Sequence, residues 1–236
     1  IDPVESTLVD RVAVGGEPHE IAVDPPREHL YVGSRRDGVV DVVNVAARER
    51  IASVDVGEGA RVQGVALSPD GSRGYAVDQR GARIAEFDPA SAEVAMGDAA
   101  REPTPDAVGG EAAVGGDPYD LVATDERVFV PGREDGTVHE FGSDLTLLAV
   151  HEGFSRPVDA FRIRGDWWVL DASDARVRSL DGETVATPAP GLVATRVGDR
   201  LLVSHYDDDL VSLVDVETGP VWTAESPAYP FGSVVI

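Results

Sequence analysis

The stretch from Val65 to Val94, VALSPDGSRGYAVDQRGARIAEFDPASAEV, predicts three short strands joined by two tight turns. Apolar runs of strand length lie at 65–67, 74–77 and 84–87. The Ser-Pro-Asp-Gly sequence at 68–71 suits the first turn, because proline presets φ and glycine allows a positive φ. Asp88 and the proline after it open the second turn, since an aspartate side chain can bond the backbone two residues further on.

This order of strands and turns recurs along most of the chain. One large apolar residue in each second strand marks the repeat, at Tyr31, Tyr75, Phe129 and Trp168. The interval before Phe129 is long, and its excess lies in a Pro-, Gly- and acid-rich segment at 97–110. Because Ala113–Pro118 repeats the pattern of Ala13–Pro18, we place this insertion between the third and fourth strands of its repeat. The alternative is a fourth strand followed by the loop, which would move the insertion to the other face.

The repeat resembles the YVTN-type β-propeller repeat, and the resemblance is strongest at 65–94 and 21–45. With no helical periodicity and a regular spacing of short strands, it implies an all-β, single-domain propeller of four-stranded antiparallel blades. We expect five complete blades and a closing blade from both termini, so five or six blades at closure. The expected spans are 18–56, 62–116, 118–151, 157–187 and 191–224, with closing strands at 7–14 and 230–236.

The charge balance limits the classes of partner. The chain of 236 residues has 43 acidic and 20 basic residues, all of the latter arginine, for a net charge of −23. Such acidity repels phosphate backbones and anionic lipid, so we expect neither nucleic acid nor membrane partners. The acidity without lysine resembles proteins of salt-loving archaea; a high-GC genome is the other explanation.

Cysteine is absent, which excludes disulfides and zinc-thiolate sites. No apolar run approaches the roughly 18 residues of a membrane span, so we expect no membrane insertion. The chain begins at Ile1 without methionine, so it is processed or trimmed, and a signal could have preceded it. We expect an extracytoplasmic or cell-surface protein, monomeric unless a partner completes the closing blade.

In a propeller, the loops before first strands and after second strands share one face around a central channel. This frame predicts a polar ligand site at the channel mouth. From the starts of first strands it takes His19, Glu20, Tyr119, Asp120 and Asp159, with Gln63 beside them. From the ends of second strands it takes Arg35, Asp78, Arg133, Asp171, His205 and Tyr206, with Ser34 and Arg80 nearby.

Two histidines and a carboxylate at this mouth, His19, Glu20 and His205, are a candidate site for Ca²⁺ or Mg²⁺. We expect the other three histidines to be structural or solvated. The Asp207-Asp208-Asp209 run lacks the spacing of a known calcium loop and is predicted to be a solvated turn.

Known catalytic motifs are absent: there is no GxSxG, HExxH, P-loop or dinucleotide fingerprint. The wider propeller group includes surface proteins and is similar to phosphogluconolactonase and streptogramin lyase. Two functions follow from the resemblance. The favoured one is a non-catalytic scaffold or binding module, surface or secreted, that recognises a protein or glycan through loops on one face. The alternative is a small-molecule hydrolase or lyase with a divalent cation at the mouth.

Overall fold

The computed structural model describes residues 7–91 and 108–231. These residues form twenty strands in five four-stranded antiparallel sheets, as the sequence predicted. The chain divides into two compact units. Unit 1 is Ile1–Ala113 with Ala123–Val128 and Gly142–Thr146, and unit 2 is Val114–Val122, Phe129–Phe141 and Leu147–Ile236. In the part of the chain described, no helix is long and apolar enough to cross a bilayer.

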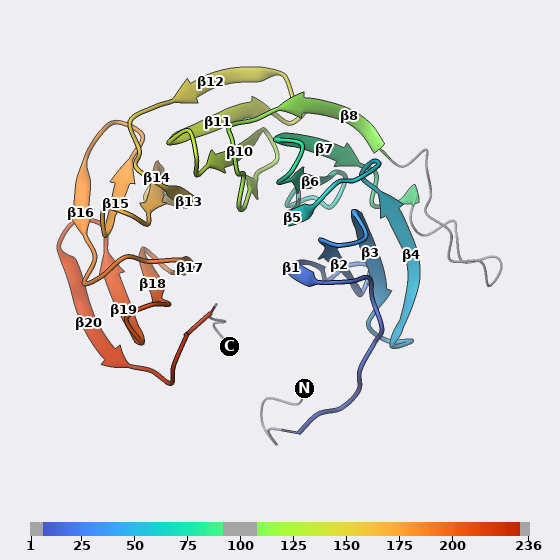
Figure 1. The fold of residues 1–236 in the computed structure, drawn as a ribbon, viewed down its shortest axis with the longest axis horizontal. Coiled ribbons are helices and arrows are strands. Elements are labelled where there is room, and N and C mark those ends of the chain that lie inside the picture. The colour runs from blue at the N-terminus through green and yellow to red at the C-terminus, as the bar shows by residue number, and fades with distance from the viewer. Residues whose placement is uncertain (1–6, 92–107, 232–236) are drawn as a thin grey trace. The chain divides into compact units, whose positions relative to one another are not determined.

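Unit 1 contains the first two sheets (Figure 1). The first sheet consists of β1 (Pro18–Asp24), β2 (His29–Ser34), β3 (Val39–Asn44) and β4 (Glu49–Asp55). The second consists of β5 (Val62–Leu67), β6 (Gly74–Asp78), β7 (Arg83–Phe87) and β8 (Val108–Ala113). The first strands β1 and β5 pack against each other.

The third sheet consists of β9 (Val122–Ala123), β10 (Arg127–Gly132), β11 (Thr137–Gly142) and β12 (Leu147–His151). Unit 2 contains the last two sheets. The fourth consists of β13 (Pro157–Ile163), β14 (Asp166–Asp171), β15 (Arg176–Ser179) and β16 (Thr184–Ala186). The fifth consists of β17 (Val193–Val197), β18 (Arg200–His205), β19 (Leu210–Asp215) and β20 (Gly219–Glu225). Here β13 packs against β17, and β16 against β20.

The two turns predicted around the Val65–Val94 stretch are confirmed. In the first, the Gly71 amide donates to the Ser68 carbonyl at 2.8 Å, and Gly71 has a φ of 68°. The Asp70 side chain accepts from the Ser68 hydroxyl at 2.6 Å and the Ser72 amide at 2.9 Å. These bonds lower the pKa of Asp70 to about 2. In the second turn, the Asp88 side chain accepts from the amide two residues on, at 2.8 Å.

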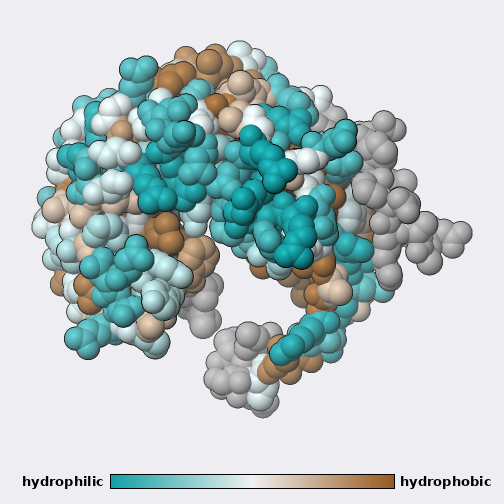
Figure 2. Space-filling model, viewed as in Figure 1, coloured by the Kyte–Doolittle hydropathy of each residue, from teal (hydrophilic) through white to brown (hydrophobic). Residues whose placement is uncertain are grey.

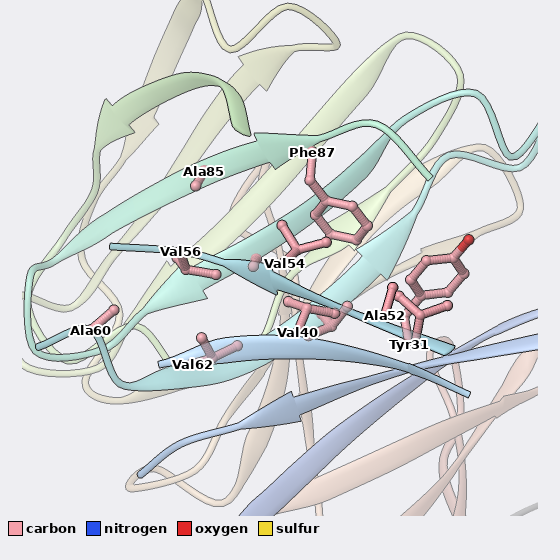
Figure 3. Close-up of a cluster of buried hydrophobic side chains, with 12 residues drawn as sticks. Tyr31, Val40, Ala52, Val54, Val56, Ala60, Val62, Ala85 and Phe87 are labelled. Carbon is pink, nitrogen blue, oxygen red and sulfur yellow. The ribbon is translucent and has the colours of Figure 1, made fainter. Parts of the chain in front are cut away.

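The core of unit 1 lies between its two sheets (Figure 3). Tyr31 and Phe87 are buried there with ring centroids 5.7 Å apart, beside valines such as Val40 and Val62. A Cβ on Gly74 would lie 2.2 Å from the Phe87 ring, so this close approach requires glycine. The large residues that mark the second strands are buried: Tyr31, Tyr75, Phe129 and Trp168. Trp167 is half-buried against Phe129, whereas the adjacent Trp168 is buried.

The insertion and both termini lie partly outside the described residues. The long connection joins β7 to β8, the third and fourth strands, where the preferred alternative placed it. Residues 97–107 of the insertion lie outside the described residues, and 108–110 begin β8. Residues 8–14, predicted as a closing strand, have no regular secondary structure. Of the other closing strand, 232–236 lie outside the described residues and Phe231 is not in a strand.

Candidate functional site

The loops before first strands and after second strands meet at one edge of each sheet. In unit 1, the Arg36 amide donates to the Gly16 carbonyl at 3.0 Å, and the Gln79 amide donates to the Arg61 carbonyl at 2.9 Å. In unit 2, the Ala172 amide donates to the Arg156 carbonyl at 2.9 Å in the same way. We call the surface formed by residues 15–19, 35–37, 57–63 and 79–81 the loop face of unit 1. Figure 2 shows hydrophilic residues gathered over the inner strands of this unit.

Asp78 lies under this face and does not open onto it. Its carboxylate accepts from the Arg61 amide at 2.8 Å and from Arg83 Nε at 3.0 Å, and the residue is 3% exposed. Burial acts to raise its pKa, but hydrogen bonds from the Arg61 and Gly81 amides and from Arg83 outweigh it and lower the pKa. The structure therefore gives Asp78 a different role from the predicted one: it ties the incoming chain to the second sheet.

Asp171 and His205 hold the same position in unit 2 and act in the same way. The Asp171 carboxylate accepts from the Ser155 amide at 2.9 Å and the Arg156 amide at 2.7 Å. His205 is fully buried, with Nδ1 3.2 Å from the Pro190 carbonyl and Nε2 2.8 Å from the Ser212 hydroxyl. Burial lowers its pKa, which favours the neutral imidazole. With both ring nitrogens engaged, His205 is not placed to bind a cation at the surface, contrary to the prediction.

In the first sheet, the incoming chain is held by a residue that the sequence analysis did not identify. Asp41, on β3, is fully buried and accepts from the Gly15 amide at 2.7 Å and the Ser34 hydroxyl at 2.6 Å. Its other oxygen accepts from Ser53 at 2.5 Å and Arg50 at 2.9 Å. Burial acts to raise the pKa of Asp41, but the hydrogen bonds from these donors outweigh it, so the pKa is lowered. The sequence feature that could have identified Asp41 is an aspartate inside the apolar strand VVDVVN.

His19 and Arg35 do lie on the loop face of unit 1, each beside the matching residue of the next repeat. His19 Nδ1 lies 3.1 Å from the Gln63 carbonyl, and the Gln63 amide nitrogen lies 2.9 Å from His19 Nε2. Arg35 donates to the Gln79 side chain at 3.2 Å. His19, Arg35 and Gln79 are half-buried, whereas Gln63 is 1% exposed. The face thus carries ordered amide, imidazole and guanidinium groups at its surface.

Four arginines gather on this face. Arg36 donates to Glu17 at 3.0 Å, and Arg61 lies 4.0 Å from the other oxygen of that carboxylate. The hydrogen bond from Arg36 lowers the pKa of Glu17, and the charges of Arg61 and Arg35 lower it further. Arg80 is exposed and donates to the Gly59 carbonyl at 3.3 Å.

The residues of the candidate metal site lie in both units, His19 and Glu20 in unit 1 and His205 in unit 2, and the site stays a prediction. Glu20 is half-buried on β1, and burial raises its pKa, which weakens it as an anionic ligand. Among residues 7–91 and 108–231, no three His, Asp or Glu side chains are placed to hold a metal ion. The Asp207–Asp209 run is an exposed turn, and Asp209 accepts from the Tyr229 amide at 2.8 Å.

The remaining predicted residues belong to unit 2. The Arg133 guanidinium lies over the Tyr119 ring at 4.1 Å and pairs with Asp117 at 2.7 Å. Asp120 and Asp159 are half-buried, and each accepts from the amide of the next residue at 2.7 Å. Tyr206 packs on the exposed Tyr229, with ring centroids 5.1 Å apart.

Comparison with known proteins identifies the fold. No family profile and no curated protein sequence matches the chain. Among solved structures, a streptogramin B lyase matches with a TM-score of 0.70 at 12% identity, over 91% of this chain and 70% of the lyase. Virginiamycin B lyase from Staphylococcus aureus matches with a TM-score of 0.70 at 11% identity, over 89% and 70%. Hydrazine synthase from Kuenenia stuttgartiensis matches with a TM-score of 0.77 at 14% identity, over 98% and 80%.

These likenesses, together with five four-stranded antiparallel sheets, show that the chain has a β-propeller fold. At such identities they show the fold alone, because one propeller scaffold carries many functions.

Proposed function

We propose that this protein is a non-catalytic binding module that recognises an acidic glycan through the loop face of unit 1. The observation that carries the proposal is the cluster of Arg35, Arg36, Arg61 and Arg80 on that face. The neighbouring exposed carboxylates are Glu17, Asp37 and Glu58, so arginines outnumber acids locally. In the whole chain, acids outnumber arginines by 43 to 20. A locally positive face on an acidic protein attracts an anionic partner and orients it during association.

The chemistry of the face suits a carboxylated sugar. A guanidinium presents its donors in a planar fork that binds a carboxylate through two parallel hydrogen bonds. His19 and Gln79 are half-exposed beside these arginines, and imidazole and amide groups both donate to and accept from sugar hydroxyls. A glycan partner also agrees with the expected surface or secreted location.

Glycan titration calorimetry tests the proposal, with an oligogalacturonate as the acidic ligand and a maltooligosaccharide of equal length as the neutral one. The expected result is binding of the acidic ligand alone. In Arg36→Gln/Arg80→Gln, the affinity should fall by about tenfold or more, the effect of losing one charge-assisted hydrogen bond or more. Arg196→Gln removes an exposed arginine of unit 2 and serves as the matched control.

Glu17→Gln provides a test in the opposite direction. Removing this carboxylate releases Arg36 and Arg61 from their ion pairs, so affinity for the acidic ligand should rise. Equal binding of acidic and neutral ligands, or equal affinity of the Arg36→Gln/Arg80→Gln variant and the control, would contradict the proposal. Protein partners remain the second kind of ligand, and selective capture of an acidic protein with no glycan binding would favour them.

A hydrolase or lyase with a divalent cation is the second candidate, and the structural likeness to two lyases favours it. Calorimetric titration of Mg²⁺ and Ca²⁺ into chelator-treated protein separates the two functions. Saturable binding that His19→Ala abolishes would support the enzyme. Heat signals equal to buffer dilution in both proteins would remove the cation site.

A further inference from the structure

A second group of arginines surrounds a pocket at the other end of the first sheet. The turn between β3 and β4 lies at the end of the sheet opposite the loop face, which begins after β2. A pocket of about 230 Å³ opens beside this turn. Its lining consists of Arg11, Val12, Ala13, Arg48, Glu49 and Arg50.

Two of these arginines are held in place by carboxylates. Arg50 donates to the buried Asp41 at 2.9 Å, and its side chain is 28% exposed. That single bond leaves other donors of the Arg50 guanidinium available to the pocket. Arg48 lies 3.7 Å from Asp10, and the other Asp10 oxygen accepts from the Arg11 amide at 2.7 Å. Asp10 therefore links the start of this segment to the β3–β4 turn through an exposed ion pair.

Arg11 supplies the third guanidinium. Its side chain is exposed and has no hydrogen-bond or ion-pair partner within residues 7–91 and 108–231. The carboxylates that pair with these arginines or line the pocket are Asp41, Asp10 and Glu49. Three guanidiniums thus balance three carboxylates, in a chain with more than twice as many acids as arginines. The site therefore lacks the negative charge of the rest of the chain, and the Arg11 guanidinium is left to pair with an anion.

We propose that this pocket binds a small oxyanion, of which a phosphate group is the best fit. Three guanidiniums can donate to three oxygens of a tetrahedral anion, a geometry that a planar carboxylate does not offer. The volume is below the roughly 300–1,000 Å³ of sites for drug-sized ligands, so it suits inorganic phosphate or a small phosphate monoester. The site is separate from the loop face, and each can be tested without the other.

The experiment is calorimetric titration of inorganic phosphate into the full chain at constant ionic strength, with glycerol phosphate and acetate as further arms. The expected result is saturable binding of phosphate in about the millimolar range, weakened about tenfold in Arg11→Gln by loss of one charge-assisted hydrogen bond. Arg11→Gln removes an exposed side chain, and an unchanged thermal midpoint without phosphate will establish that the variant is folded. Arg196→Gln, which removes an exposed arginine of unit 2, should bind phosphate as the parent does.

Saturation by inorganic phosphate alone would limit the ligand to the free ion, whereas tighter binding of glycerol phosphate would assign the site to a phosphate monoester. Equal affinity for acetate and phosphate would overturn the proposed geometry. Failure of phosphate to saturate the protein, or equal affinity of the parent and Arg11→Gln, would overturn the site itself. Neither result would affect the glycan proposal, since the two sites share no residue.

Discussion

Replacing Asp41 with asparagine should destabilise the protein more than any comparable change at its surface. Each carboxylate oxygen of Asp41 accepts two hydrogen bonds, one pair from Arg50 and Ser53 and the other from the Gly15 amide and Ser34. Asparagine keeps one acceptor oxygen and presents an amide nitrogen in place of the other. The serine hydroxyls can rotate to accept from that nitrogen, but neither Arg50 nor the Gly15 amide can.

The size of the effect follows from that geometry. One donor is left without an acceptor, which costs about 1–3 kcal/mol. The charge pairing with Arg50 is also lost; breaking a buried ion pair costs about 3–5 kcal/mol, reduced here because water reaches part of the Arg50 side chain. We expect about 3 kcal/mol in the free energy of unfolding, or roughly 6–12 °C in the thermal midpoint for a chain of this size.

Urea unfolding at several pH values is the assay. Because the pKa of Asp41 is lowered in the folded state, its contribution is fully present above the unfolded pKa of about 3.9 and is lost as pH falls through the folded value. The difference between the parent and Asp41→Asn should therefore be constant from pH 7 to about pH 5 and should shrink in stronger acid.

Asp37→Asn is the matched control, because this exposed aspartate accepts a single hydrogen bond, from the Gly16 amide at 2.8 Å. If Asp41→Asn costs no more than Asp37→Asn, or if the difference does not depend on pH, the buried carboxylate does not tie the incoming chain to the first sheet.

Three further changes should alter the stability of the protein in a predictable direction. Gly74→Ala brings a methyl group against the Phe87 ring and should lower the free energy of unfolding by about 1–3 kcal/mol in urea titration; an unchanged midpoint would show that the ring moves freely. Ala82→Gly should raise it by up to about 1 kcal/mol, because Ala82 has a φ of 46° in a turn whose counterpart in the first sheet is a glycine, Gly38; a loss of stability would contradict this. The thermal midpoint should rise between low and molar KCl, since salt screens the repulsion within a chain of net charge −23; a flat response would remove the argument for a salt-loving source.

The strands and turns could be predicted because they depend on local chemistry. Proline, aspartate and glycine at 68–71 decide the turn by their own φ preferences and side-chain bonds, which neighbours hardly alter. The large residues of the second strands, such as Tyr31 and Tyr75, recur once per repeat because each fills the space between sheets. Residues 8–14 of the strand expected at 7–14 have no regular secondary structure, and most of its expected partner at 230–236 lies outside the described residues.

The candidate site was harder to predict, because side chains one residue apart at the end of a strand point in opposite directions. Asp78, Asp171 and His205 end their second strands and point inward, where backbone groups of the incoming chain compensate for their burial. The residue after each second strand instead reaches the loop face, as Arg35 and Gln79 do in unit 1.

Sequence spacing placed both positions in the same region but could not decide which of them faces solvent. Only the hydrogen bonds distinguish a buried tether from a ligand-binding residue. It follows that further variants aimed at ligand binding belong at the positions directly after the second strands. Variants at Asp78, Asp171 or His205 would instead report on the stability of the sheets, whatever the ligand is.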